Sequence, residues 1–422
     1  MESINNWVNK LLVAYPDKTE RIVYLFIFLF PIAGMSVRHW ISNIFNILVL
    51  IGLFTLKKPR EPLLKQEKIF LWICVAYFSM FIISSFANEW TKIQTYYLGT
   101  EMRFLFVIPL YLLIRRYEDS SFWLLRGALV GGFFLFGQAF YDVIIRDLPT
   151  AIGVYSKNII GPFAVLIVYY GIYLFLQNFK IYKWQHLLLI FLSVIAALFA
   201  ASMSGSRGSY VGFAVTGFAS VLFFSKPRWM FAALFTISII IVLFYQSSSI
   251  VKPGVDTAVN EVEQYLAAED HVKDLSSTTP AGVRLEMFRT TMLFIKDNLF
   301  VGIGPGNYRS RTLSYVKEAK VHQAVAEYSH PHNSFIEVAS AKGILGLITL
   351  LLLFYYPAYI YIKNYKTCKP TAVIGLIHIV AISAFALSDH SLVLMNNYTS
   401  IILLGMIIFL SSHIRSCRDH IK

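Results

Sequence analysis

The sequence predicts an all-α protein that crosses a membrane many times and carries one large, partly helical loop outside it. Three observations support this fold class. Of the 422 residues, 57% are hydrophobic and only 14% are charged, against roughly 25% charged residues in an average soluble domain. The mean hydropathy is +0.60. The apolar residues are gathered in long runs, and most positively charged residues fall between alternate runs.

About twelve apolar runs approach the roughly 20 residues that a helix needs to span a bilayer. The fourth run is the least regular, because Glu101 and Arg103 precede a short apolar core. No cleavable signal peptide is expected, since several charged residues up to Arg21 precede the first run and no small-residue cleavage site follows it. The expected spans are 22–36, 39–56, 69–87, 98–114, 121–145, 159–176, 184–203, 208–224, 228–246, 334–362, 371–388 and 396–414.

Every second connection between the spans is rich in Lys and Arg. The alternate connections hold mainly Arg38, Lys92, Arg103, Arg146 and Arg207. By the positive-inside rule the rich connections are cytoplasmic, so both termini are expected inside the cell. The alternate connections, with the long loop, are expected to face the periplasm of a bacterial inner membrane.

The net charge of +13 follows from this distribution. It does not indicate nucleic-acid binding, because the positive residues are spread over many short connections rather than gathered on one face. Cys74 lies in a span, whereas Cys368 and Cys417 lie on the cytoplasmic side. Neither a disulfide nor a cysteine metal site is therefore expected.

Three regions follow from this topology: the first nine spans in 1–246, the periplasmic loop in 247–333 and the last three spans in 334–422. Within the loop, "TTPAGVRLEMFRTTMLFIKDN" predicts an amphipathic helix that starts near Pro280 and lies on the membrane surface or over the bundle. The glycines of "LFVGIGPGNY" predict a tight turn between two loop helices. A phosphate-binding loop is the other interpretation, but no strand precedes it and no Lys-Ser/Thr pair follows. The expected apolar stripe of the helix is Leu285, Phe288, Met292, Ile295 and Leu299.

The stretch "HPHNSFIEVASAKGILG" places two histidines, His330 and His332, at the start of an apolar segment. Ser334 and Glu337 have the spacing of a capping box, so the tenth span is expected to begin at Ser334. The positive end of a helix disfavours a nearby imidazolium. We therefore expect His332 to be a neutral imidazole that can accept a proton.

Gly343 and Gly346 share a face of this span with Ala339. Small residues allow another helix to approach closely, which would hold the histidine-bearing end rigidly. In the alternative interpretation, His330 and His332 are ordinary interfacial loop residues and the glycines serve packing alone. These residues by themselves leave both interpretations open.

Two arginines on the same outer side favour a functional site. Arg207 lies in the turn "MSGSRGSY", and Arg284 opens the amphipathic loop helix. An arginine at membrane level is costly in free energy unless it has an anionic partner. One guanidinium group can donate two parallel hydrogen bonds to phosphate oxygens. With His332 they would form a site for a phosphorylated lipid. The simpler interpretations are that Arg207 reaches toward lipid headgroups and that Arg284 is solvated.

The sequence resembles the O-antigen ligase and polymerase superfamily. The motif is a histidine followed by Asn, Ser or Gln, then nine residues and Gly-x-x-Gly. The matching residues here are His332, Asn333, Gly343 and Gly346. The resemblance also covers the number of spans, the position of the loop, the turn at 206–208, the helix of Arg284 and the glycine turn at 302–306.

The resemblance implies glycosyl transfer from a polyprenyl-diphosphate donor in the periplasm. An O-antigen ligase moves the glycan from undecaprenyl diphosphate to a sugar hydroxyl of the lipid A core during lipopolysaccharide biosynthesis. By this resemblance His332 is the general base, Arg207 and Arg284 bind the donor diphosphate, and His330 and Asn333 support them. A single displacement would invert C1. The implied partners are the undecaprenyl-diphosphate-linked glycan, the lipid A-core acceptor and membrane lipids.

No cofactor and no metal ion are expected. The outer loops contain no Asp-x-Asp pair, and arginines can stabilise the charge that Mg²⁺ stabilises in other enzymes. His330 and His332 have no third zinc ligand at a convincing spacing.

Other functions remain as alternatives. A polymerase joins glycan repeat units to each other, and a protein O-oligosaccharyltransferase uses a Ser or Thr acceptor and often carries additional periplasmic sequence. The non-enzyme alternative is a transporter of lipid-linked glycans. Against it, the two halves show no repeat, and the polar residues gather on one outer face rather than at the midplane.

Overall fold

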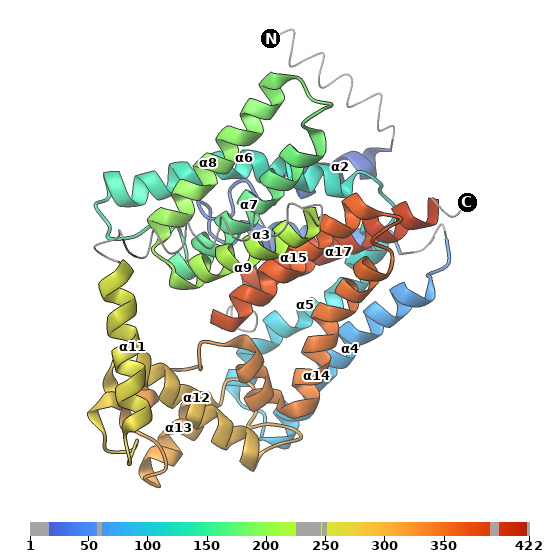
Figure 1. Cartoon of the computed structure of the whole chain (residues 1–422). Helices are drawn as coiled ribbons and strands as arrows, with labels where there is room; N and C mark the ends of the chain where they lie inside the picture. Colours follow the sequence, from blue (N-terminus) through green and yellow to red (C-terminus); the bar gives the residue numbers. More distant parts are fainter. Residues whose placement is uncertain (1–16, 57–60, 225–245, 247–250, 389–395, 420–422) are drawn as a thin grey trace.

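The computed structural model describes the whole chain except residues 1–16, 57–60, 225–245, 247–250, 389–395 and 420–422 (Figure 1). The described residues form α-helices, short 3-10 helices and one π-helical turn, and they contain no strand. Several of the helices are long and apolar. The all-α, multi-pass membrane fold that the composition predicts is confirmed.

Eight helices in the described part are long and apolar enough to cross a membrane. Two shorter apolar helices, α3 (Trp40–Phe54) and α9 (Arg207–Phe224), accompany them. The eight are α4 (Lys65–Ala87), α5 (Lys92–Ile114), α6 (Ser120–Phe140, continued by the π-helical turn Tyr141–Ile145), α7 (Lys157–Asn178), α8 (Trp184–Ser204), α14 (Ser334–Lys363), α15 (Lys369–Ser388) and α17 (Asn396–Asp419).

The described residues therefore show fewer spans than the expected twelve. The run expected at 22–36 gives α2 (Lys18–Leu29), which has only 12 residues. Most of the run expected at 228–246 lies outside the described residues. The irregular fourth span begins at Lys92 instead of residue 98, because Thr91 caps the helix and extends it over its polar first turns.

The helices pack into one bundle around α17. In α17, 83% of the residues of its apolar stretch are buried, whereas in α6 only 33% of the corresponding residues are buried. α17 packs against α3, α5 and α15, whereas α14 packs against α4 and α15. α6 and α8 instead leave large apolar side chains such as Phe134, Leu189 and Phe199 exposed. Such side chains suit contact with lipid, so α6 and α8 lie at the periphery of the bundle.

Successive helices run in opposite directions through the bundle, and this gives it two ends. The segment 251–333 precedes α14 and projects from one end, which we call the loop end (Figure 1). α17 finishes at the other end, which we call the opposite end. The starts of α5 and α14 and the finish of α4 lie at the loop end, whereas the finish of α5 and the start of α4 lie at the opposite end.

The segment at the loop end has a small hydrophobic core of its own. It contains α11 (Val251–Ala267), α12 (Pro280–Asp297), α13 (Tyr308–Lys317) and the 3-10 helices η2 (Leu275–Thr278) and η3 (Gln323–Glu327). The predicted amphipathic helix is α12, which begins at Pro280. Its buried face is not the expected stripe: Met287 and Phe294 are in the core, whereas Met292 and Leu299 are 51% and 45% exposed.

Cys368 and Cys417 form a disulfide with Cα atoms 5.6 Å apart, so the expectation of no disulfide is wrong. Cys368 directly precedes α15, and Cys417 lies in the last turn of α17. The two residues are 49 positions apart. Only the packing of α15 against α17 brings them together, which the spacing of the cysteines does not reveal.

Candidate functional site

The start of α14 lies where the capping pattern predicts it, at Ser334. The capping residue is Asn333 rather than Ser334: its Oδ1 accepts the backbone N–H groups of Phe335 at 3.0 Å and Ile336 at 3.1 Å. The amide nitrogen of Asn333 donates to the carbonyl of Leu387 in α15 at 3.1 Å. One side chain therefore begins α14 and fixes it to the last turn of α15.

The two histidines stand side by side immediately before this cap. His332 has a left-handed backbone with φ 54°, a conformation that few non-glycine residues adopt. Its N–H approaches Nδ1 of His330 at 3.4 Å, and the two rings are nearly perpendicular with centroids 4.3 Å apart. His330 is only 9% exposed, whereas His332 is partly exposed. His330 thus supports the backbone of His332, and His332 has the more exposed imidazole of the two.

Gly343 breaks α14 two turns further on. Its φ of 71° and ψ of −176° are not helical. In place of helical bonds, the N–H of Ile344 donates to the Leu299 carbonyl at 2.8 Å, and the Ser340 carbonyl accepts from Ile303 at 2.8 Å. The expected small-residue face against another helix is therefore wrong at Gly343. The loop backbone fills the break and satisfies the freed groups, as a membrane-level break requires.

The glycine turn 302–306 is the part of the loop that docks on this break. Gly302, Gly304 and Gly306 all have positive φ, which confirms a tight turn between α12 and α13. Asn88 at the end of α4 donates to the Gly302 carbonyl at 3.0 Å, and Gln94 of α5 donates to the Pro305 carbonyl at 2.8 Å. Two membrane helices thus hold the turn.

A Cβ atom at Gly343 would lie 2.1 Å from the Phe300 carbonyl oxygen. The loop backbone therefore touches the helix where only glycine leaves room. Gly346 has a different role, because its Cβ would meet the Cβ of Lys342 within the same helix at 2.4 Å. The first glycine of the motif serves the loop contact, and the second makes room for a lysine side chain.

A buried ion pair that the sequence analysis missed lies below the histidines. Nζ of Lys342 is 2.7 Å from Oε1 of Glu101 on α5, and both side chains are 0% exposed. The same ammonium group is 3.9 Å from the ring centre of Tyr77 on α4. An ionisable residue inside an apolar span is by itself a signal of a special site. That signal was present at Lys342.

Arg284 lies at the start of the second turn of α12 and is exposed. It lines a groove of about 500 Å³ between α11 and α12. Glu261 also lines the groove, and its carboxylate accepts the backbone N–H of Ala281 at 2.8 Å. α12 packs against α14. The groove thus provides an exposed guanidinium group on a helix that touches the histidine-bearing helix.

A buried carboxylate anchors α12. Glu286 accepts two hydrogen bonds from Arg289 at 2.7 and 2.8 Å, one from the Tyr265 hydroxyl at 2.7 Å and one from the His322 N–H at 3.0 Å. Burial acts to raise the pKa of Glu286. The hydrogen bonds from Arg289, His322 and Tyr265 outweigh it, so the pKa is lowered overall. Glu286 therefore joins α11, α12 and the segment before η3 while it is ionised.

Arg207 begins α9, which packs against α7 and α15. Its side chain lies outside the part of the chain that the structure describes. The structure brings His330, His332, Asn333 and the Gly343 break together at the loop end of α14, with Arg284 on a helix that packs against α14. That Arg207 and Arg284 meet His332 at one substrate stays a prediction.

Comparison with known proteins gives two kinds of match. Residues 191–351 match the family model described as O-antigen ligase. This range runs from α8 through the loop segment to the part of α14 beyond Gly346. A protein of Escherichia coli K12 named O-antigen ligase is 25% identical over 250 residues, which cover 56% of this chain and 54% of that protein. An uncharacterized protein of Haemophilus influenzae Rd is 23% identical over 347 residues, which cover 79% of this chain and 84% of that protein.

Proposed function

Residues 191–351 match the family model described as O-antigen ligase, and from this premise we propose that the chain is such a ligase and transfers a glycan from undecaprenyl diphosphate to a sugar hydroxyl of the lipid A core. The reaction takes place on the periplasmic face of the bacterial inner membrane, at the loop end of the bundle. Both termini then lie in the cytoplasm, as the distribution of Lys and Arg favours.

His332 is the general base in this proposal. The acceptor hydroxyl oxygen forms a bond to C1 of the donor sugar while the bond from C1 to the diphosphate oxygen breaks. The hydroxyl proton passes to the His332 imidazole, and undecaprenyl diphosphate departs with the bonding electron pair. This single displacement inverts the configuration at C1.

One observation carries the assignment of His332. It is a partly exposed imidazole, held in a left-handed conformation by His330 on one side and the Asn333 cap on the other. A strained, doubly supported residue at a helix start points to a functional constraint rather than to a free loop. Its exposure distinguishes it from the buried His330.

Arg284 and Arg207 stabilise the departing diphosphate. Guanidinium groups bind phosphate oxygens through paired hydrogen bonds and remain charged at any physiological pH. The exposure of Arg284 in the groove between α11 and α12 supports this role. We propose that the transfer needs no divalent metal ion, because the arginines supply the positive charge. Activity should therefore persist after exhaustive chelation.

The test supplies the purified full-length chain with an undecaprenyl-diphosphate glycan and rough lipopolysaccharide, and it follows attachment of the glycan to the lipid A core on a gel. We expect a product only when both lipids are present. His332→Ala should abolish transfer, whereas His186→Ala, an exposed histidine at the opposite end of the bundle, should not. Donor chains that lengthen without the acceptor would instead indicate a polymerase, and glycan on a Ser or Thr peptide would indicate a protein glycosyltransferase.

A further inference from the structure

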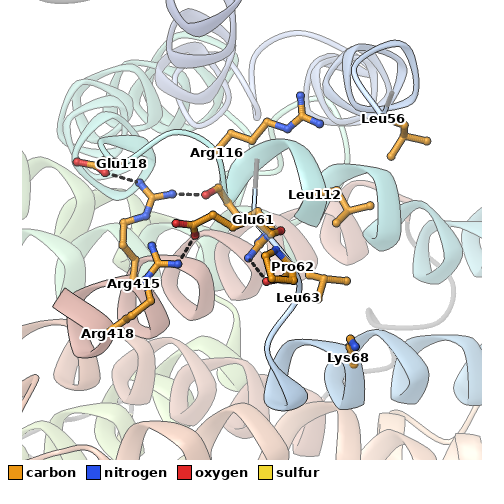
Figure 2. Close-up of a pocket in the computed structure, with 11 residues that line it drawn as sticks. Leu56, Glu61, Pro62, Leu63, Lys68, Leu112, Arg116, Glu118, Arg415 and Arg418 are labelled. Atoms are coloured by element: carbon orange, nitrogen blue, oxygen red, sulfur yellow. Dashed lines mark hydrogen bonds and ion pairs between the residues drawn. The ribbon is translucent and has the colours of Figure 1, made fainter. Parts of the chain in front are cut away.

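A pocket of about 530 Å³ (Figure 2) opens at the opposite end of the bundle. The end of α5, the start of α4 and the last turns of α17 form its walls. Figure 2 shows Arg415 and Arg418 on one side of it and Leu63 and Lys68 on the other. The proposed transfer reaction uses none of these residues.

Positive charge dominates the lining of this pocket. The cationic residues are Lys68, Arg115, Arg116, Arg415 and Arg418, and the lining carboxylates are Glu61 and Glu118. Behind the wall, Glu67 pairs with Arg115 at 3.0 Å. Asp419 likewise lies 3.9 Å from Arg418. With Glu67 and Asp419 included, five cations face four carboxylates, which leaves an excess of one positive charge. An anion that enters the pocket therefore meets a favourable field.

The protein itself uses only part of the hydrogen-bonding capacity of these cations. Arg415 contacts Glu118 at 3.5 Å, and Arg418 forms an ion pair with Glu61. Nη1 of Arg415 and Nε of Arg418 are buried and donate no hydrogen bond among the described residues. Each has only a longer ion-pair contact, to Glu118 at 3.5 Å and to Asp419 at 3.9 Å. Lys68 is exposed and has no ion-pair partner in the described part of the chain. Buried N–H groups without an acceptor cost free energy, and an oxyanion in the pocket would satisfy them.

Apolar side chains share the pocket with the cations. Leu56, Leu63 and Leu112 all line it, and Leu56 is 37% exposed. A soluble phosphate ion would gain nothing from these leucines. A phospholipid would use both parts of the lining, because its phosphate suits the guanidinium groups and the first carbons of its acyl chains suit the leucines.

We propose that this pocket binds a phosphate-bearing anion, supplied by the headgroup of an anionic phospholipid such as phosphatidylglycerol. The lipid would hold α4, α5 and α17 together at the opposite end of the bundle. The proposal is independent of the transfer reaction, because it concerns the other end of the molecule and a different binding event.

The experiment measures lipid binding to the purified full-length chain by native mass spectrometry, with phosphatidylglycerol and phosphatidylcholine as probes. Phosphatidylglycerol should bind more tightly than the zwitterionic lipid. Lys68→Gln and Arg418→Gln should each weaken phosphatidylglycerol binding about fivefold, the effect of one cation near a lipid phosphate. Lys180→Gln, an exposed lysine in the connection between α7 and α8 at the same end, is the matched control and should leave binding unchanged.

Glu61→Gln gives a test in the other direction. Loss of its charge releases Arg418, so phosphatidylglycerol should bind more tightly. A parallel titration with inorganic phosphate separates the two sources of the anion. If inorganic phosphate binds in the absence of lipid and displaces phosphatidylglycerol, the pocket is a phosphate site for a soluble anion, and its assignment to a lipid is wrong. Equal affinity for the two lipids, or an equal effect of Lys68→Gln and Lys180→Gln, would overturn the proposal.

Discussion

The ammonium nitrogen of Lys342 lies 2.7 Å from a carboxylate oxygen of Glu101, and neither side chain has any exposed surface. The pair joins α14 to α5 directly below the start of α14. Lys342 immediately precedes the break at Gly343. The ion pair therefore holds the final residue of the short helical segment that follows the two histidines.

Removal of one member of this pair should destabilise the protein strongly. Lys342→Met leaves the Glu101 carboxylate buried without its partner, and the free energy of unfolding should fall by about 3 to 5 kcal/mol. The double variant Lys342→Met, Glu101→Leu should recover most of the loss, because it leaves no buried charge. Thermal unfolding in detergent, followed by tryptophan fluorescence, measures both. A double variant as unstable as the single one would contradict this account.

Gly343→Ala should separate the loop from α14. The added methyl group would overlap the Phe300 carbonyl, and alanine is strained at a φ of 71°, so a cost of about 2 kcal/mol or more is expected. Transfer activity should fall with it, since the contact positions the segment that bears His332. Gly137→Ala in α6 is the control, because its Cβ would meet nothing within 4 Å. Similar stability and activity in the two variants would show that the break is not needed.

Asn333 has two separable roles. Asn333→Ala removes the cap and should cost about 1 kcal/mol, together with most of the activity. Asn333→Asp keeps an acceptor for the N–H groups of Phe335 and Ile336 but cannot donate to the Leu387 carbonyl. We expect Asp to restore stability more than activity, because the tie to α15 is still missing. Full recovery of both would show that only the cap matters. Unfolding and initial transfer rates are measured on the same preparations.

Acid should loosen the loop segment through Glu286. Its pKa is lowered in the folded chain, below roughly 4.3 in the unfolded chain. The ionised carboxylate therefore contributes its full stabilisation above the unfolded value, and this is lost as the pH falls through the lower, folded value. The protection of the α12 amides from hydrogen exchange, relative to the intrinsic exchange rate at each pH, should fall over that range. In Glu286→Gln the α12 amides should be weakly protected at every pH. If the variant instead lost its protection over the same pH range as the unchanged protein, the assignment to Glu286 would be refuted.

The spans could be predicted closely from the sequence because bilayer thickness fixes their length. The run expected at 334–362 is Ser334–Lys363, and the run expected at 184–203 is Trp184–Ser204. The expectation was poorer for the first span, where α2 is short, and for the fourth, where a polar cap adds turns that hydropathy does not register.

The motif residues His330, His332 and Asn333 do lie together, because all three belong to one short stretch before α14. The break at Gly343 could not be predicted. Glycine in an apolar run is usual in membrane helices, and only the loop backbone around Phe300 requires a positive φ there. Lys342 and Glu101 are separated by 241 positions, and nothing in a local pattern pairs them. These features depend on tertiary packing.

Gly343 divides α14 into two pieces that contact different parts of the protein. The longer piece crosses the bundle, with Leu350, Leu353 and Phe354 buried against its neighbours. The shorter piece, Ser334 to Lys342, forms hydrogen bonds with the glycine turn of the loop and with a side chain of α4, and an ion pair with α5. A change in the loop sequence can therefore reorient His332 while the longer piece keeps its place in the bundle. The break at Gly343 thus separates the position of His332 from the position of the longer piece.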